Sequence, residues 1–321
     1  MSVVSKRIDL QLITDYRLAP DHCLMANLQE LRRRVGSVRN MQKITKAMKM
    51  VAASRLRRAQ QRVVAARPYS NTMTRVLGRL AERAGDYKHP LLDPRGDDRY
   101  VVVLITGDRG LCGAFNANLT KAAQQFTREH PGKTIDLVTI GRKGRDFFRR
   151  RHANILREYT NVADRGVRSE TAAEIAREVM DLYKEEGSTI DRVFLVYSEF
   201  KTALSQRVLV KQLLPIGTES FDAAPAAEAS AEGEVLIDYL YEQPPAEIFG
   251  ALLPAYVENQ IFYALLESTA SELGAKMTAM DSASNNAGDV IDALTLTINR
   301  VRQASITREI IEVVSGAQAL D

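Results

Sequence analysis

Hydrophobic positions in the last third of the chain repeat every seven residues. One row consists of Leu273, Met280, Ala287, Leu294 and Val301. A companion row consists of Met277, Ser284, Ile291, Ile298 and Ser305. The rows lie three and four residues apart, which is the a/d pattern of a coiled coil. Because no proline occurs between Ala255 and Leu320, the pattern predicts one continuous helix, on the order of 100 Å long at ~1.5 Å per residue.

A second proline-free stretch, from Asn27 to Arg67, has apolar residues at spacings of three to five. They are Leu28, Leu31, Val35, Val38, Met41, Ile44, Met48, Val51 and Leu56. Two intervals of three meet at Met41, which predicts a local distortion of the supercoil there. A long helix at each end of one chain predicts an antiparallel coiled coil, with the chain folded back on itself.

The middle of the chain alternates between strand and helix patterns. We expect strands at 100–106, 135–140, 192–197 and 207–216, a further strand at 235–241, and helices at 117–129, 141–150 and 169–186. This alternation is typical of a small parallel or mixed sheet with helices on its faces. The fold class is therefore α/β, with a Rossmann-like central domain and a long terminal coiled coil.

These patterns divide the chain into four segments. Residues 1–24 lack the helical pattern and are interpreted as an extension or a mis-assigned start, with Met25 as the alternative start. The N-terminal coiled-coil helix is expected over 25–90, the central domain over 95–243, and the C-terminal coiled-coil helix over 244–321. Within the central domain, the Ala- and Glu-rich segment 217–233 predicts a mobile loop.

The glycine-rich turn Gly107–Asn116 (GDRGLCGAFN) is the first place to look for phosphate chemistry. Its glycines are spaced G-x-x-G-x-x-G, which is neither the dinucleotide fingerprint nor a P-loop. The turn therefore predicts tight backbone geometry against a neighbouring element. Two cysteines, Cys23 and Cys112, and four scattered histidines indicate no triad, metal cluster or disulfide framework. We expect no catalytic residue, cofactor or metal site.

Charge is concentrated on the N-terminal helix. Between Asn27 and Arg67 the only acid is Glu30. The basic residues are Arg32, Arg33, Arg34, Arg39, Lys43, Lys46, Lys49, Arg55, Arg57, Arg58, Arg62 and Arg67. Since like charges at i,i+4 repel, this imbalance predicts an acidic partner: nucleic acid, anionic lipid or an acidic protein surface. No stretch of the 321 residues approaches ~20 continuous apolar residues, so any membrane association is expected to be indirect.

Three segments together resemble one known family. They are LRRRVGSVRNMQKITKAMKMVAASRLRRAQ (31–60), the turn at Gly107–Asn116, and the C-terminal run from Leu265 to Leu320, which contains RQASIT and IEVVSGAQAL. In order and spacing they are similar to the gamma subunits of F-type ATP synthases, from Met25 to the end of the chain.

The resemblance implies a rotor shaft with no active site of its own, in a proton-transporting enzyme complex that makes ATP. Its coiled coil would sit inside an alternating hexamer of alpha and beta subunits, with the central domain beside the epsilon subunit and the membrane ring of c subunits. It also implies a peripheral location on the cytoplasmic face of the bacterial plasma membrane.

The family pattern also assigns contact residues. Met48 and Lys49 match positions that meet acidic loops of the catalytic subunits, although Met48 and Met277 are equally well interpreted as seam residues. Lys276 stands where the family commonly has arginine, so a bidentate contact there is in doubt. Matches to the contact set for a catalytic-subunit loop are Arg302, Gln303 and Thr307. Leu273, Met277, Met280, Ile291, Leu294, Ile298 and Val301 are assigned to the seam.

Two other classes remain open from the residues alone. The central alternation permits a Rossmann-type oxidoreductase, which would need a dinucleotide fingerprint that the turn lacks. The basic helix permits a nucleic-acid-binding coiled coil, although no aromatic residues interleave its basic positions for stacking. Tight binding of a nicotinamide cofactor would support the first class, and steep salt-dependent binding of DNA the second.

Overall fold

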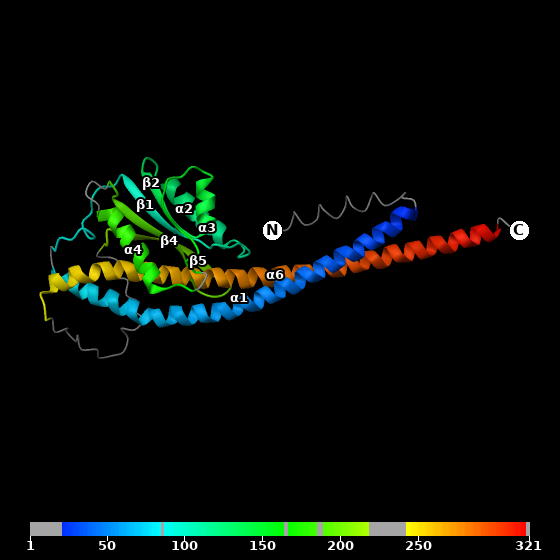
Figure 1. Cartoon of the computed structure of the whole chain (residues 1–321), viewed down its shortest axis with the longest axis horizontal. Helices are drawn as coiled ribbons and strands as arrows, with labels where there is room; N and C mark the ends of the chain where they lie inside the picture. The colour runs from blue at the N-terminus through cyan, green and yellow to red at the C-terminus, as the bar shows by residue number, and fades with distance from the viewer. Residues whose placement is uncertain (1–20, 85–86, 164–165, 185–188, 218–241, 319–321) are drawn as a thin grey trace. The chain divides into compact units, whose positions relative to one another are not determined.

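The computed structural model describes residues 21–84, 87–163, 166–184, 189–217 and 242–318. The chain forms two compact units. The body comprises Lys49–Ala279, and the coiled-coil unit comprises Met1–Met48 together with Met280–Asp321. Two long helices contribute to both units: α1 (Asp21–Ala84) and α6 (Pro245–Gln318). The sequence expectation of a long helix near each end and a central α/β domain is confirmed (Figure 1).

The body contains a five-stranded sheet. In chain order its elements are β1 (Arg99–Ile105), α2 (Phe115–Glu129), β2 (Thr134–Ile140), α3 (Arg142–Arg149), β3 (Ile155–Tyr159), α4 (Ser169–Lys184), β4 (Arg192–Phe200) and β5 (Gln206–Leu214). The strand order is β3-β2-β1-β4-β5. All neighbours are parallel except β4 and β5, which form an antiparallel hairpin. Parallel strands joined through helices make the fold Rossmann-like.

Strand β1 is central and buried on both faces, which explains its uninterrupted apolar sequence. Tyr100, Val102 and Leu104 pack in one cluster with residues of α2 and α3. Val101, Val103 and Ile105 pack on the opposite face with α1, α4 and α6. The two long helices α1 and α6 therefore belong to the core of the body.

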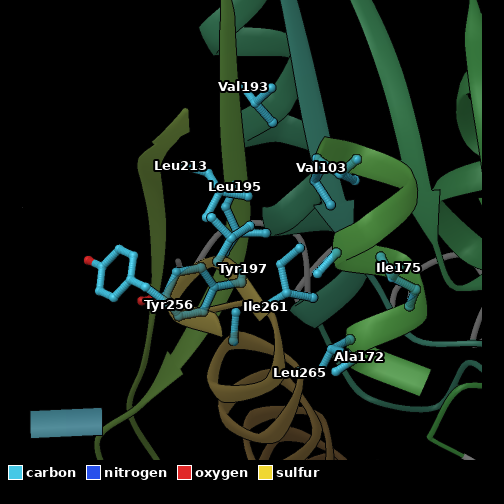
Figure 2. Packing of buried hydrophobic residues seen from close by; sticks show 14 of the residues in the cluster. Val103, Ala172, Ile175, Val193, Leu195, Tyr197, Leu213, Tyr256, Ile261 and Leu265 are labelled. Carbon is cyan, nitrogen blue, oxygen red and sulfur yellow. The ribbon is translucent and has the colours of Figure 1, made fainter. Parts of the chain in front are cut away.

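Figure 2 shows the second of these clusters at close range. Ile261 of α6 lies beside Tyr197 of β4, Leu265 of α6 lies beside Ala172, and these side chains are buried in one cluster with Leu195. Ala172 and Ile175 of α4 close the cluster from the side. Burying apolar side chains of this size stabilises the fold by roughly 1.5–3 kcal/mol each, so this cluster anchors α6 firmly to the sheet.

In the coiled-coil unit, α6 buries one stripe of residues three and four apart. Met280, Ser284, Ala287 and Ile291 are buried. Leu294, Ile298, Val301 and Ser305 continue the stripe half-buried. The stripe packs against α1, where the Gln42 Nε2 donates a hydrogen bond of 3.2 Å to the backbone oxygen of Ser284. In the body, Leu273 and Met277 are half-buried against the apolar cluster.

The distortion expected near Met41 is wrong. Met41 and Ile44 are 61% and 60% exposed, so neither belongs to the seam. Gln42 is half-buried and Thr45 is buried in their place. The seam thus keeps regular spacing through two polar residues, because Thr45 donates to the oxygen of Gln42 (3.0 Å) and Gln42 bonds across to α6. Val51 is also exposed, and Ala52 is buried beside it.

Strand β3 was not expected from the sequence. It lies at the sheet edge, pairs only with β2 within the described residues, and no side chain in it is fully buried. The expected loop at 217–233, apart from Gly217, and the expected strand at 235–241 lie outside the described residues. Among the helices that the structure describes, none has an apolar stretch long enough to cross a membrane.

Replacing Ile291 with aspartate should split the coiled-coil unit. Ile291 is 9% exposed in the seam, and an unpaired carboxylate there costs several kcal/mol. Leu296→Asp is the matched control, because Leu296 lies on the same helix and is 69% exposed. Limited proteolysis should cut Ile291→Asp rapidly within 280–318 and leave Leu296→Asp near the wild-type rate. Equal protection of both variants would contradict the seam.

Burial raises the pKa of Tyr256 to about 12, from an ordinary value of ~10. Between these values the unfolded chain loses the phenolic proton and the folded chain keeps it. Stability is therefore complete below pH ~10 and falls by up to about 1.4 kcal/mol per pH unit towards pH 12. Urea unfolding across this range should show a shallower decline for Tyr256→Phe. An unchanged slope would show that Tyr256 titrates normally in the folded state.

Candidate partner-binding surface

The far end of α6 exposes apolar side chains that no described residue covers. After Ser305 the heptad rows continue with Arg308 and Glu312, so the apolar seam stops. The apolar residues that follow lie off these rows and are exposed: Ile306, Ile310, Ile311, Val313 and Val314. A contiguous exposed apolar surface on a helix end is typical of a binding site for another protein.

This surface was missed from the sequence, where the end of the chain was interpreted as more of the rod. The sequence does contain a signal for this surface, because the apolar residues change their heptad positions after Ser305. When polar residues take the a and d positions while isoleucine and valine move to neighbouring positions, the helix can no longer bury them against its coiled-coil partner. The apolar residues at 306–314 then require a different partner.

The three contact residues assigned near this end share the same stretch of helix. Arg302, Gln303 and Thr307 are all exposed. The Thr307 hydroxyl donates to the backbone oxygen of Gln303 at 2.9 Å, one helical turn away. The structure thus places a guanidinium, an amide and a hydroxyl beside the apolar end, which is a combination that can fix the orientation of a bound loop.

The basic residues of α1 are largely exposed along its length. Arg34 pairs with Glu30, the only acid in that stretch. Arg67 is not purely solvated, because its Nη2 lies 3.8 Å from the buried Glu267 of α6. Met48 and Lys49 are half-buried. The charged face of α1 in the coiled-coil unit suits an acidic protein surface.

Lys276 lies in the body and is held within its own helix. Its Nζ is 2.8 Å from the Glu272 Oε1, one turn earlier, and both side chains are mostly buried. The Glu272 carboxyl group in turn lies against Gly107, where an added Cβ would come within 2.9 Å of it. Lys276 is therefore part of the packing between α6 and the glycine turn, and its assignment as a partner contact stays a prediction.

The glycine turn packs tightly, as the sequence indicated. Gly107 is covered by Glu272, and Gly113 has a φ of 55°, a conformation that side chains disfavour. Cys112 is buried, and this burial raises the pKa of its thiol. A buried thiol with a raised pKa is a poor nucleophile, so Cys112 is a packing residue.

The carboxyl ends of the strands, where doubly wound sheets bind ligands, are closed by the chain itself. The Asp108 carboxylate accepts hydrogen bonds from the backbone N–H groups of Arg142 (3.1 Å) and Asn161 (2.9 Å). The cavity left beneath α6 is about 20 Å³, whereas ligand sites are typically about 300–1,000 Å³. A dinucleotide does not fit in this cavity. The described residues also contain no cluster of three potential metal ligands.

Comparison with known proteins agrees with this geometry. A family model described as ATP synthase matches residues 27–320. An ATP synthase gamma chain from Solibacter usitatus (strain Ellin6076) is 49% identical over 301 residues, covering 92% of this chain and all of that protein.

Solved structures show the same architecture. A chain from the central stalk and c-ring of the Tetrahymena thermophila mitochondrial ATP synthase is 26% identical, with a TM-score of 0.56 over 75% of this chain and 99% of that one. A chain from the Euglena gracilis mitochondrial ATP synthase shares the fold at 20% identity, with a TM-score of 0.63 over 92% and 95% of the two chains. The match to the family model and the identity to curated relatives show that this chain belongs to the ATP synthase gamma chain family.

Proposed function

We propose that this chain is the rotor shaft in the central stalk of a proton-translocating ATP synthase. The observation that carries the proposal is the coiled-coil unit itself. It presents exposed apolar residues at 306–314 and exposed basic residues on α1, and both features suit a protein partner around the coiled coil. Its relatives are gamma chains, and one of its structural neighbours comes from a central stalk.

The partners follow from the same family. An alternating hexamer of alpha and beta subunits would enclose the coiled-coil unit. The sheet domain would meet the epsilon subunit and the membrane ring of c subunits. The location would be the cytoplasmic face of the bacterial plasma membrane, with the chain held there as a peripheral subunit by the ring.

The chain would act by allostery rather than by bond chemistry. The two helices of the shaft differ in sequence along their whole length. Each orientation of the shaft therefore presents a different surface to the three catalytic sites. A site changes its nucleotide affinity only if the shaft makes different contacts with its different states. The exposed Arg302, Gln303 and Thr307 are proposed as such contacts, together with Met48 and Lys49. Rotation of a rigid element against a partner with discrete arrangements then couples proton flow to ATP synthesis.

Reconstitution tests the proposal directly. The chain, beginning at Met25, is mixed with the alpha and beta subunits of the same organism, and the assembly is isolated by size. One copy should elute with each hexamer, and multi-site ATP hydrolysis should depend on it. A chain that elutes alone, with hydrolysis unaffected, would contradict the proposal and direct attention to nucleic acid as the partner of the basic helix.

Replacing Arg302, Gln303 and Thr307 together with alanine should lower ATP hydrolysis by the assembled complex roughly tenfold or more, because two or three hydrogen bonds to the hexamer worth ~1–1.5 kcal/mol each are lost. A double replacement of Thr297 and Arg300 with alanine is the matched control. Both control residues are exposed on the same helix, and the Thr297 hydroxyl donates to the backbone oxygen of Ala293 one turn earlier, as the Thr307 hydroxyl does to Gln303. Equal rates for the two variants would remove these three residues from the contact set.

A further inference from the structure

Strand β4 extends beyond the strand that pairs with it. The ladder between β1 and β4 ends at Leu104 and Val196, whereas β4 continues to Phe200 and stays paired with β5 as far as Gln206. On the side that β1 no longer covers, the backbone groups of the last β4 residues need other partners. Ser198 is buried there, and a buried backbone group without a hydrogen bond is strongly disfavoured.

Side chains of α6 take the place of the missing strand. The Ser198 N–H donates to the Ser268 Oγ at 3.1 Å, and the Ser271 hydroxyl donates to the Ser198 oxygen at 3.1 Å. The Phe200 N–H donates to the Glu267 Oε2 at 2.7 Å. Glu267, Ser268 and Ser271 are all buried. We refer to these three α6 residues as the β4 latch.

The same face of α6 continues onto the turn between β4 and β5. The Thr278 hydroxyl donates to the Ala203 oxygen at 3.2 Å. Between the latch and Thr278 lies Gly274, where an added Cβ would come within 3.3 Å of the Ala203 oxygen. Gly274 therefore permits close approach of the helix to the hairpin, and Glu267, Ser271, Gly274 and Thr278 follow the four-three-four spacing of one helix face.

Glu267 joins the hairpin to both shaft helices. Its side chain is 1% exposed. While its Oε2 is held by β4, its Oε1 has no hydrogen-bond partner within the described residues, and the Arg67 Nη2 of α1 lies 3.8 Å away. Tyr263, one turn earlier on α6, has a pKa raised to about 12 by burial and by this carboxylate. Apolar packing alone would not need a buried carboxylate at this point.

We propose that the β4 latch, with Glu267 as its central positioning residue, transmits torque between the sheet domain and the shaft helices. This proposal rests on the proposed function as a rotor. The apolar cluster around Ile261 and Leu265 holds α6 against the sheet, but apolar attraction is non-directional and resists sliding weakly. Hydrogen bonds depend steeply on distance and angle. The latch therefore fixes the register of α6 on β4, so that rotation of one forces rotation of the other.

The test uses the whole ATP synthase in sealed vesicles and compares ATP hydrolysis with ATP-driven proton pumping. Glu267→Met keeps the volume and removes the acceptor for the Phe200 N–H, whereas Glu267→Gln keeps an acceptor. The double variant Ser268→Ala with Ser271→Ala removes the other two bonds with little change in volume. Glu258→Gln is the control, because Glu258 lies on the same helix and pairs with Arg177 at the surface, at 3.3 Å.

We expect Glu267→Met and the double serine variant to keep hydrolysis within about twofold of wild type and to pump several-fold fewer protons per ATP. Glu267→Gln should restore most of the pumping, and Glu258→Gln should behave as wild type. If Glu267→Met fails to assemble, the double serine variant decides the question.

Wild-type pumping per ATP in the variants that assemble would overturn the latch, as would equal losses in Glu267→Gln and Glu267→Met. A purely structural role would lower assembly and hydrolysis together with pumping and leave the ratio unchanged. Failure of the rotor proposal itself is distinguishable, because hydrolysis by the wild-type complex would then not depend on this chain at all.

Discussion

Burial of one side of α6 is the constraint on which the rest of this structure depends. In the body, that helix buries Leu253, Val257, Ile261 and Leu265 in the core. In the coiled-coil unit it buries Met280, Ala287 and Ile291. A helix as long as α6, Pro245–Gln318, is not held straight by its own propensity in water; its stability comes from tertiary packing along its apolar face. Each unit therefore exists because α6 brings it an apolar surface to cover.

The chemistry of the buried face of α6 changes along the helix, from polar contacts with β4 in the body to a mostly apolar seam with α1 in the coiled-coil unit. Where α6 meets β4, serine and glutamate side chains replace apolar ones and bond to the strand backbone. Where it meets α1 in the coiled-coil unit, Gln42 and Ser284 make a polar contact in a seam that is mostly apolar. Buried polar positions of this kind are best known for fixing register. A shaft needs fixed register at both places, since slippage would lose the angle that it transmits.

The elements that hydrophobic periodicity encodes were predicted from the sequence. The features that depend on tertiary contacts were not. The long helices and the central α/β alternation followed from apolar spacing. The N-terminal seam was placed one residue off around Met41 and Ile44, because apolar residues were assumed to lie inside, whereas Gln42 and Thr45 are the residues that face α6. Strand β3 was not predicted because apolar and polar residues alternate only weakly in its sequence, ILREY, which lies at an exposed edge of the sheet.

Other features could not be obtained from the sequence in principle. Gly274 was part of the helical pattern, but only the position of Ala203 in space explains why glycine stands there. The pairing of Glu267 with the Phe200 N–H joins residues far apart in the chain, and no local pattern encodes it. The contact residues came from resemblance to a family, since no local pattern distinguishes exposed positions such as Arg302 and Gln303 from other polar positions on the helix.

The measurement that tests the central claim most directly is observation of rotation in single molecules. The alpha and beta hexamer is fixed to a surface, and a bead is attached to the exposed Leu204 position in the turn between β4 and β5, through a cysteine introduced there. If this chain is the shaft, the bead turns in one direction when ATP is added and stops when ATP is removed. Sustained, chain-dependent hydrolysis with a bead that only fluctuates about a fixed angle would contradict the account.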